Sequence, residues 1–258
     1  MQQITFEQFK EIYKNHYKEL VTFLTQHDFP FSCACGTMLG AIREHDIIEW
    51  DYDIDNFFME EDLDKLLSIE KDLPNNFYLE SYVDNTLKYG LVRVCCKDLF
   101  RHDKKSSKYI NVFFDFFALK NVLISEERRK KEFLKTIKLE KKAAFKQSTH
   151  KSHSRIKELI KKIYKFFLPT FLKVSKRVER KVDKLGFGPS SIMCKSFKIV
   201  STEPINKNEI INVSYSSFSI PCYKNFNNIL ETLYGKDWET PKEFGERIIP
   251  EFYLTKDL

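Results

Sequence analysis

The sequence predicts an α+β fold in which a small mixed β-sheet is flanked by helices and carries a basic helical insertion. Two observations favour it. Short apolar segments of strand length recur through the first 125 residues, and helical spacing dominates residues 126–185. A chain of 258 residues is long enough to bury roughly 70–75% of its unfolded surface in one elaborated domain.

The pattern of apolar residues predicts one long helix near the N-terminus and a series of shorter elements after it. A capping-box pattern at residues 5–8 precedes a stripe of aromatic and leucine side chains, which predicts a helix that ends near His27. Strands are expected at residues 31–35, 52–59, 76–83, 89–96 and 110–119, and further helices at residues 38–43, 61–73 and 226–234.

The charge is divided unevenly along the chain. The net charge of +6 combines +14 over residues 126–185, where 21 basic residues stand against 7 acidic ones, with −8 over the remainder. This boundary predicts three parts. Residues 1–125 form the core, residues 126–185 form the basic helical insertion, and residues 186–258 complete the core domain.

The chain shows none of the usual signals of export or membrane insertion. The first residues lack a signal-peptide pattern, no apolar run reaches the length of a membrane span, and the six cysteines fit neither a disulfide framework nor a paired zinc motif. We therefore expect a cytoplasmic protein with reduced thiols.

The acidic segment from Trp50 to Asp55 is the most informative stretch. On a strand, Asp51, Asp53 and Asp55 would share one face at a spacing of roughly 7 Å, and such carboxylates repel one another unless a cation neutralises them. Oxygen ligands of this kind suit Mg²⁺ or Mn²⁺. A solvated acidic edge strand remains an alternative. A calcium loop is disfavoured because Asn56 takes the position of the invariant glycine.

Two further features complete a candidate site. Gly36, Thr37 and Gly40 lie where a strand turns into a helix, an arrangement that presents backbone N–H groups to a phosphate, although an ordinary strand–helix connection would look similar. Asp115 interrupts a very apolar strand, so we expect it either to act in the site or to form an ion pair with an arginine.

These segments resemble the LicD family, which is related to the fukutin-related proteins and lies within the nucleotidyltransferase superfamily. The specific match covers Gly36–Arg43 and Asp46–Asp55, with weaker matches around Arg93, around Asp115 and over residues 221–241. Two departures are visible. Tyr52 replaces the middle of three consecutive aspartates, and Ala118-Leu-Lys120 replaces the usual Pro-Leu-Asp.

The resemblance implies a nucleotidyltransferase-like fold and assigns roles to individual residues. Asp53, Asp55 and Asp115 would be catalytic and would hold Mg²⁺ or Mn²⁺, with Asp51 in the outer part of the site. The residues expected to contact donor phosphates are Gly36, Thr37, Gly40, Arg43 and Arg93, the last with a structural salt bridge as its alternative.

The resemblance also implies a reaction. Phosphocholine, or a polyol phosphate such as ribitol phosphate, would move from a CDP-activated donor to a sugar hydroxyl of a surface glycan or its lipid-linked precursor, with release of CMP. Two alternatives stay open: a nucleotidyltransferase that uses an NTP and releases pyrophosphate, and a non-catalytic membrane-binding scaffold.

The basic insertion has its own candidate function. From Ile156 to Lys173, apolar residues recur at helical spacing among lysines, with a break at Pro169. Such a helix suits the surface of an anionic membrane, which would place the protein on the inner face of the cell membrane. A packed helical subdomain with a solvated lysine face is the alternative. Nucleic-acid binding is not expected, because no known binding module is present.

Overall fold

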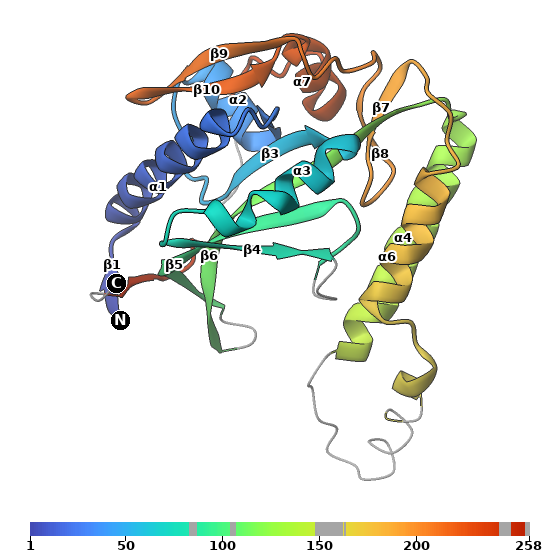
Figure 1. Ribbon diagram of the computed structural model, residues 1–258, viewed down its shortest axis with the longest axis horizontal. Helices are drawn as coiled ribbons and strands as arrows, with labels where there is room; N and C mark the ends of the chain where they lie inside the picture. The colour runs from blue at the N-terminus through green and yellow to red at the C-terminus, as the bar shows by residue number, and fades with distance from the viewer. Residues whose placement is uncertain (83–86, 104–106, 148–161, 163, 243–248, 256–258) are drawn as a thin grey trace.

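A computed structural model describes residues 1–82, 87–103, 107–147, 162, 164–242 and 249–255 of the chain (Figure 1). Within them the fold is α+β: a mixed nine-stranded sheet is flanked by helices, and a separate two-stranded sheet lies beside it. The predicted fold class is confirmed, although the sheet is larger than expected because strands from the C-terminal part join it.

The sheet is built from both ends of the chain. Its main strand order is β1-β11-β5-β6-β3-β2, with β4 paired to β5, and with β7 paired to both β6 and β8. The strands of this sheet are β1 (Gln2–Ile4), β2 (Ser32–Cys33), β3 (Ile54–Met59), β4 (Phe77–Ser81), β5 (Leu91–Asp103), β6 (Lys108–Val122), β7 (Ser190–Met193), β8 (Lys198–Ser201) and β11 (Phe252–Leu254). Strands β9 (Ile210–Tyr215) and β10 (Phe218–Tyr223) form the small second sheet.

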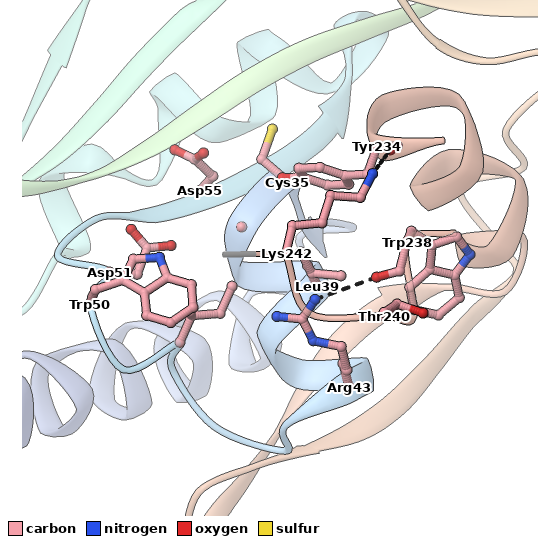
Figure 2. Close-up of a pocket in the computed structure, with 12 residues that line it drawn as sticks. Cys35, Leu39, Arg43, Trp50, Asp51, Asp55, Tyr234, Trp238, Thr240 and Lys242 are labelled. Carbon is pink, nitrogen blue, oxygen red and sulfur yellow. Dashed lines mark hydrogen bonds between the residues drawn. The ribbon is translucent and has the colours of Figure 1, made fainter. Parts of the chain in front are cut away.

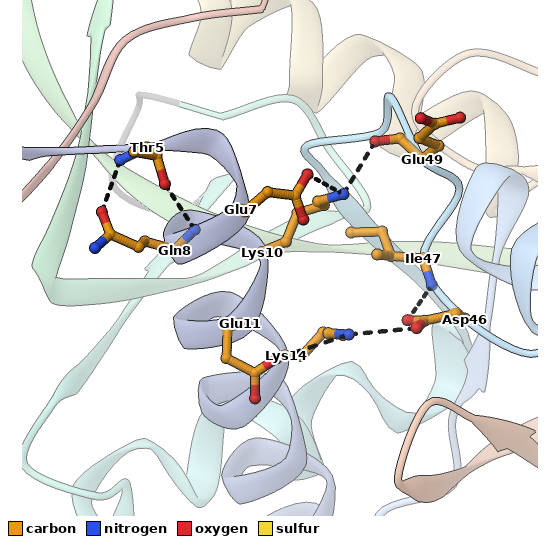
Figure 3. Close-up of polar contacts among 9 residues, drawn as sticks. All are labelled: Thr5, Glu7, Gln8, Lys10, Glu11, Lys14, Asp46, Ile47 and Glu49. Atoms are coloured by element: carbon orange, nitrogen blue, oxygen red, sulfur yellow. Dashed lines mark hydrogen bonds and ion pairs between the residues drawn. The ribbon is translucent and has the colours of Figure 1, made fainter.

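Helix α1 (Phe6–Gln26) confirms the helix predicted at the N-terminus. Thr5 accepts a hydrogen bond from the backbone of Gln8, whose side chain accepts one from the backbone of Thr5, so the predicted capping box is present (Figure 3). The apolar stripe of α1 is buried, and Tyr13 stacks on Phe114 of β6 with ring centroids 4.8 Å apart. This packing covers one face of the sheet.

Several predicted elements differ from the structure in their limits. Strand β3 begins at Ile54, two residues later than expected, and the helix expected at residues 61–73 is divided into η1 (Glu60–Asp62), α3 (Leu63–Ser68) and η2 (Glu70–Asp72). Helix α2 (Cys35–Arg43) includes Gly36 and Thr37, which we had placed in the preceding turn. Helix α7 (Phe226–Tyr234) matches its prediction.

In its described residues the basic insertion contains two long helices, which lie side by side and extend away from the sheet (Figure 1). Helix α4 (Glu126–Gln147) and helix α6 (Phe171–Val182) bury Ala143 and Val178 and are joined by an ion pair between Glu132 and Lys181. The predicted break at Pro169 is present, since α6 begins only after Thr170, its N-cap. The predicted apolar positions Ile156, Leu159, Ile160 and Ile163 lie outside the described residues.

Candidate active site

Three neighbouring strands bring three charged side chains into line. Asp55 of β3 is the register partner of Asp115 on the parallel strand β6, and Asp115 is the register partner of Arg93 on the antiparallel strand β5. Adjacent strands lie about 4.8 Å apart, so the three side chains are immediate neighbours on one face of the sheet. Helix α1 covers the opposite face.

Asp115 and Arg93 form an ion pair, the alternative that we had left open for both. Arg93 Nε donates to Asp115 Oδ1 at 2.8 Å, and the guanidinium lies 3.9 Å from the ring centroid of Phe113. The ion pair binds one oxygen of the carboxylate. Asp115 therefore lies in the site with one carboxylate oxygen already engaged.

A second cation, which sequence reasoning missed, lies on the other side of Asp115. Lys195 Nζ is 3.5 Å from the ring centroid of Phe117, two residues after Asp115 on the same face of β6. Burial lowers the pKa of Lys195, and the nearby carboxylates of Asp115 and Asp55 act in the opposite direction. Lys195 belongs to the turn between β7 and β8, eighty residues beyond Asp115 in the sequence.

Asp51 and Asp53 lie in the segment that leads into β3, not in the strand itself. The prediction of three carboxylates on one strand is therefore wrong in that detail, because strand pairing starts only at Ile54. The carboxylates are nevertheless close, since burial and the Asp53 carboxylate together raise the pKa of Asp51 to about 8. The whole segment contributes negative charge to the same site.

The pKa of Asp55 is raised by its surroundings as strongly as that of Asp51. Burial, followed by the negative charges of Asp53 and Asp115, raises the pKa of Asp55 from 3.8 to about 8, while Lys195 acts in the opposite direction. Among the described residues, no three His, Cys, Asp or Glu side chains are grouped closely enough to hold a metal ion as they stand. The charge of the carboxylates fits a divalent cation, but a preformed cage of three ligands is not present.

The glycine-threonine segment shapes this acidic site. A Cβ atom on Gly36 would lie 2.6 Å from Asp51 Oδ2, so only glycine lets the carboxylate approach the start of α2. Thr37 is buried, and its hydroxyl accepts a hydrogen bond from the backbone N–H of Asp55 at 2.9 Å. Gly40 packs against the chain near Asp46, where a Cβ would meet a backbone oxygen at 2.5 Å. Thr37 and Gly40 thus hold the site together by contacts within the protein.

A pocket of about 270 Å³ opens beside Asp51 and Asp55. Figure 2 shows the Cys35 side chain near Asp55, with Trp50 beside Asp51 and Tyr234 and Trp238 across the pocket. The pocket is therefore acidic at one end and aromatic along its walls. Its volume and its chemistry suit part of a small organic ligand.

Two cationic side chains line the same pocket. Arg43 Nη1 donates to the backbone oxygen of Trp238 at 3.4 Å (Figure 2). Arg43 Nη2 pairs with Glu44 at 2.6 Å. Lys242 Nζ lies 3.0 Å from Asp237 Oδ1. Arg43 was predicted from the sequence, whereas Lys242 and the aromatic walls contributed by α7 and the residues after it were not.

The segment before Asp51 is anchored to α1. Lys14 Nζ lies 3.3 Å from Asp46 Oδ2, and Lys10 Nζ donates to the backbone oxygen of Glu49 at 3.5 Å (Figure 3). Asp46 also accepts a hydrogen bond from the backbone N–H of Ile47 at 2.7 Å. These contacts fix the loop that carries Asp51 to helix α1.

Two buried tyrosines of helix α1 form hydrogen bonds to the strands that carry the site. Tyr13 donates to the backbone oxygen of Phe113 at 2.6 Å and accepts from the backbone N–H of Ile54 at 3.2 Å, so one hydroxyl joins β6 to β3. Tyr17 donates to Asn56 Oδ1 at 2.6 Å. Since buried polar groups are costly unless paired, this network fixes the register that sets Asp55 beside Asp115.

A parallel β3–β6 pair with one aspartate on each strand, next to Gly36 and Thr37 in the first turn of α2, is the arrangement expected of a nucleotidyltransferase-type domain. The chain matches the LicD/FKTN/FKRP nucleotidyltransferase domain family over residues 29–159, just over half of its length, and it belongs to that family. Membership supports a phosphotransferase-type function, that is, transfer of a phosphate-containing group.

Two curated relatives match a shorter region. An uncharacterized protein of Rickettsia typhi is 28% identical over 98 residues, and one of Rickettsia prowazekii is 30% identical over 93 residues. These matches cover 38% and 36% of this chain, but only 31% and 34% of the relatives. The chain thus spans about a third of the length of the relatives that it matches.

Proposed function

We propose that this protein is a metal-dependent phosphotransferase that moves phosphocholine, or a polyol phosphate such as ribitol phosphate, from a CDP-activated donor to a sugar hydroxyl, with release of CMP. The observation that carries the proposal is the register pairing of Asp55 with Asp115, next to a pocket large enough for part of a nucleotide. The acceptor would be a cell-surface glycan or its lipid-linked precursor.

The proposed metal is Mg²⁺ or Mn²⁺, held by Asp53, Asp55 and Asp115, with Asp51 in an outer position. Raised pKa values at Asp51 and Asp55 support it, because burial and the neighbouring carboxylates together disfavour the charged forms, and a bound cation would offset both effects. When bound, the ion would neutralise the donor diphosphate and the charge that develops on the departing CMP.

The chain's own residues would position the two reactants. With Oδ1 of Asp115 held by Arg93, Oδ2 is the oxygen placed to accept the proton of the attacking sugar hydroxyl. Lys195, above Phe117, would contact the non-bridging oxygens of the transferred phosphate. Catalysis would then rest mainly on positioning and on neutralisation of charge.

The pocket would hold the donor. Arg43 and Lys242 are the cations within reach of a diphosphate in it, and the aromatic walls offer flat apolar surface to a base or a head group. The proposed contact of Arg93 with the diphosphate is weaker than the sequence suggested, because Arg93 already pairs with Asp115. The backbone at Gly36 remains a candidate phosphate contact, because it lines the pocket.

We also propose that the protein works in the cytoplasm at the inner face of the membrane, where a lipid-linked acceptor would be presented. Among the described residues, no helix combines the length and the apolar character needed to span a bilayer. Attachment would therefore be peripheral in this part of the chain.

A donor screen tests the reaction. The protein is incubated with Mg²⁺ and, separately, CDP-choline, CDP-ribitol or an NTP mixture, together with a glycan acceptor preparation. Release of CMP that depends on both the acceptor and Mg²⁺ is the expected result. Asp53→Asn should abolish it, whereas Asp64→Asn, an exposed aspartate on α3, should leave it unchanged.

The two rivals predict different results in the same screen. A nucleotidyltransferase would release pyrophosphate from an NTP and no CMP from the CDP donors. A non-catalytic scaffold would release neither product under any condition. Either result would refute the proposed reaction.

A further inference from the structure

The distal end of the α4–α6 hairpin gathers exposed aromatic rings. Tyr164, Phe166 and Phe167 form a helical turn just before α6, and Phe145 lies near the end of α4. Phe166 and Phe167 are 77% and 78% exposed. These four residues make up most of the strongly exposed aromatic side chains in the described part of the chain.

The exposed rings are held in a defined arrangement. Lys146 Nζ donates to the backbone oxygen of Leu168 at 2.7 Å, which ties the turn to the end of α4. Phe166 and Phe167 contact each other with ring centroids 5.4 Å apart, and the rings of Phe145 and Tyr164 lie 6.1 Å apart. These contacts join the exposed rings to the end of α4.

The charge around these rings has one sign. We define the hairpin tip as residues 141–146, 162 and 164–168. It contains five lysines and no aspartate or glutamate. The acidic residues nearest to it along α4 are already paired, since Glu140 lies 2.8 Å from Lys88 and Glu132 pairs with Lys181. The described residues of the tip therefore carry a net positive charge.

We propose that the hairpin tip is a docking surface for an anionic lipid bilayer. Exposed phenylalanines next to lysines match the two parts of a membrane interface, because the rings enter the acyl boundary while the ammonium groups remain among the lipid phosphates. The turn before α6 lies at the end of the α4–α6 hairpin that is far from the sheet (Figure 1). The inference extends the proposed peripheral location to named residues, and it does not depend on which group is transferred.

Vesicle co-sedimentation of the full chain tests the inference without any activity measurement. We expect binding to phosphatidylcholine vesicles that contain about one third phosphatidylglycerol, and little binding to phosphatidylcholine alone. Binding should weaken on going from about 0.1 M to about 1 M salt, because the Debye length falls from about 10 Å to about 3 Å. Failure of the wild-type chain to bind the anionic vesicles in low salt would overturn the inference.

Matched variants test which residues are responsible. The double variant Phe166→Ser with Phe167→Ser should lower the vesicle partition coefficient about a hundredfold, roughly tenfold for each ring removed. Phe187→Ser is the control, because Phe187 is 80% exposed but follows α6 at the opposite end of the hairpin. An equal loss in the control, or no loss in the double variant, contradicts the assignment.

A charge variant separates lipid from nucleic acid. Lys142→Gln with Lys162→Gln should weaken vesicle binding and reduce its dependence on salt, since both lysines belong to the hairpin tip. A short DNA duplex serves as the competitor. If it binds the wild-type chain tightly, displaces the vesicles and is unaffected by the Phe166 and Phe167 substitutions, the tip is a nucleic-acid surface and the bilayer proposal is wrong.

Discussion

The substitution Asp55→Asn should stabilise the metal-free protein at alkaline pH. Asp55 has a pKa raised from 3.8 to about 8 by burial and by neighbouring negative charge. The folded protein therefore binds the Asp55 proton more tightly than the unfolded chain does. The contribution of this group to stability is greatest below about pH 4 and is lost as the pH rises from about 4 to about 8.

The size of the effect follows from the same pKa difference. Each pH unit between the two pKa values corresponds to about 1.4 kcal/mol, so the upper bound is about 5 kcal/mol at pH 8. The site is open to water on the pocket side, which reduces the penalty, and we expect about 2 kcal/mol. Asparagine has nearly the same shape as aspartate and removes the charge without leaving a cavity.

Urea denaturation at about pH 5 and about pH 8, with a chelator present, measures the effect. The free energy of unfolding of Asp55→Asn should exceed that of the wild type by about 2 kcal/mol more at the higher pH than at the lower. Addition of Mg²⁺ should stabilise the wild type at pH 8 and should have little effect on the variant, because the variant lacks one of the proposed ligands.

Asp115→Asn provides the matched control, because this substitution should lower the free energy of unfolding where Asp55→Asn raises it. Asp115 accepts a hydrogen bond from Arg93 at 2.8 Å, so its loss leaves a partly buried guanidinium without its partner and should cost about 1–3 kcal/mol. If Asp55→Asn is destabilising by the same amount at both pH values, the Asp55 carboxylate is satisfied by protein cations. The argument for a divalent ion would then fail.

Three further substitutions probe the site. Gly36→Ala should lower Mg²⁺-dependent CMP release by about tenfold or more, because the new methyl group would displace the Asp51 carboxylate. Unchanged release in a steady-state assay would show that the close approach of Asp51 to residue 36 is not needed. Thr37→Val should reduce the free energy of unfolding by about 1–2 kcal/mol in urea, since the backbone N–H of Asp55 loses its acceptor; an unaffected midpoint would contradict this. Lys195→Met should reduce kcat/KM for the donor by about tenfold to a hundredfold, with partial recovery in Lys195→Arg, and equal activity of all three forms would remove Lys195 from the site.

Local patterns in the sequence were sufficient for the elements whose signals are short in range. The capping box at Thr5 and the stripe along α1 specify that helix without any distant contact, and helix α7 was predicted to its last residue. Strands β7 to β10 were missed: β7 pairs with the distant strand β6, β8 pairs with β7, and β9 and β10 pair with each other apart from the main sheet. Strand β7, for example, is defined by its pairing with β6.

The same distinction separates the site residues that were predicted from those that were missed. Asp51, Asp53 and Asp55 stand together in a distinctive motif, and Asp115 is conspicuous in an apolar strand. Lys195 has no local signal, since it is one of many lysines and becomes notable only when the β7–β8 turn brings it over Phe117. A lone buried cation of this kind can be recognised only from tertiary structure.

The charge balance of the assembled site gives the strongest physical argument for a divalent ion. Four carboxylates lie in or beside this site, from Asp51, Asp53, Asp55 and Asp115, and among the described residues Arg93 and Lys195 are the cations next to Asp115 and Asp55.

Arg43 and Lys242 do not change this balance, because each has an acidic partner of its own. When all four carboxylates are ionised, their charge exceeds that of Arg93 and Lys195 by two, and this excess supports the proposal of one Mg²⁺ or Mn²⁺ ion. Burial first, and then the neighbouring carboxylates, raise the pKa values of Asp51 and Asp55 in the ion-free protein. A site evolved as a structural ion-pair network would have no reason to leave that excess in place.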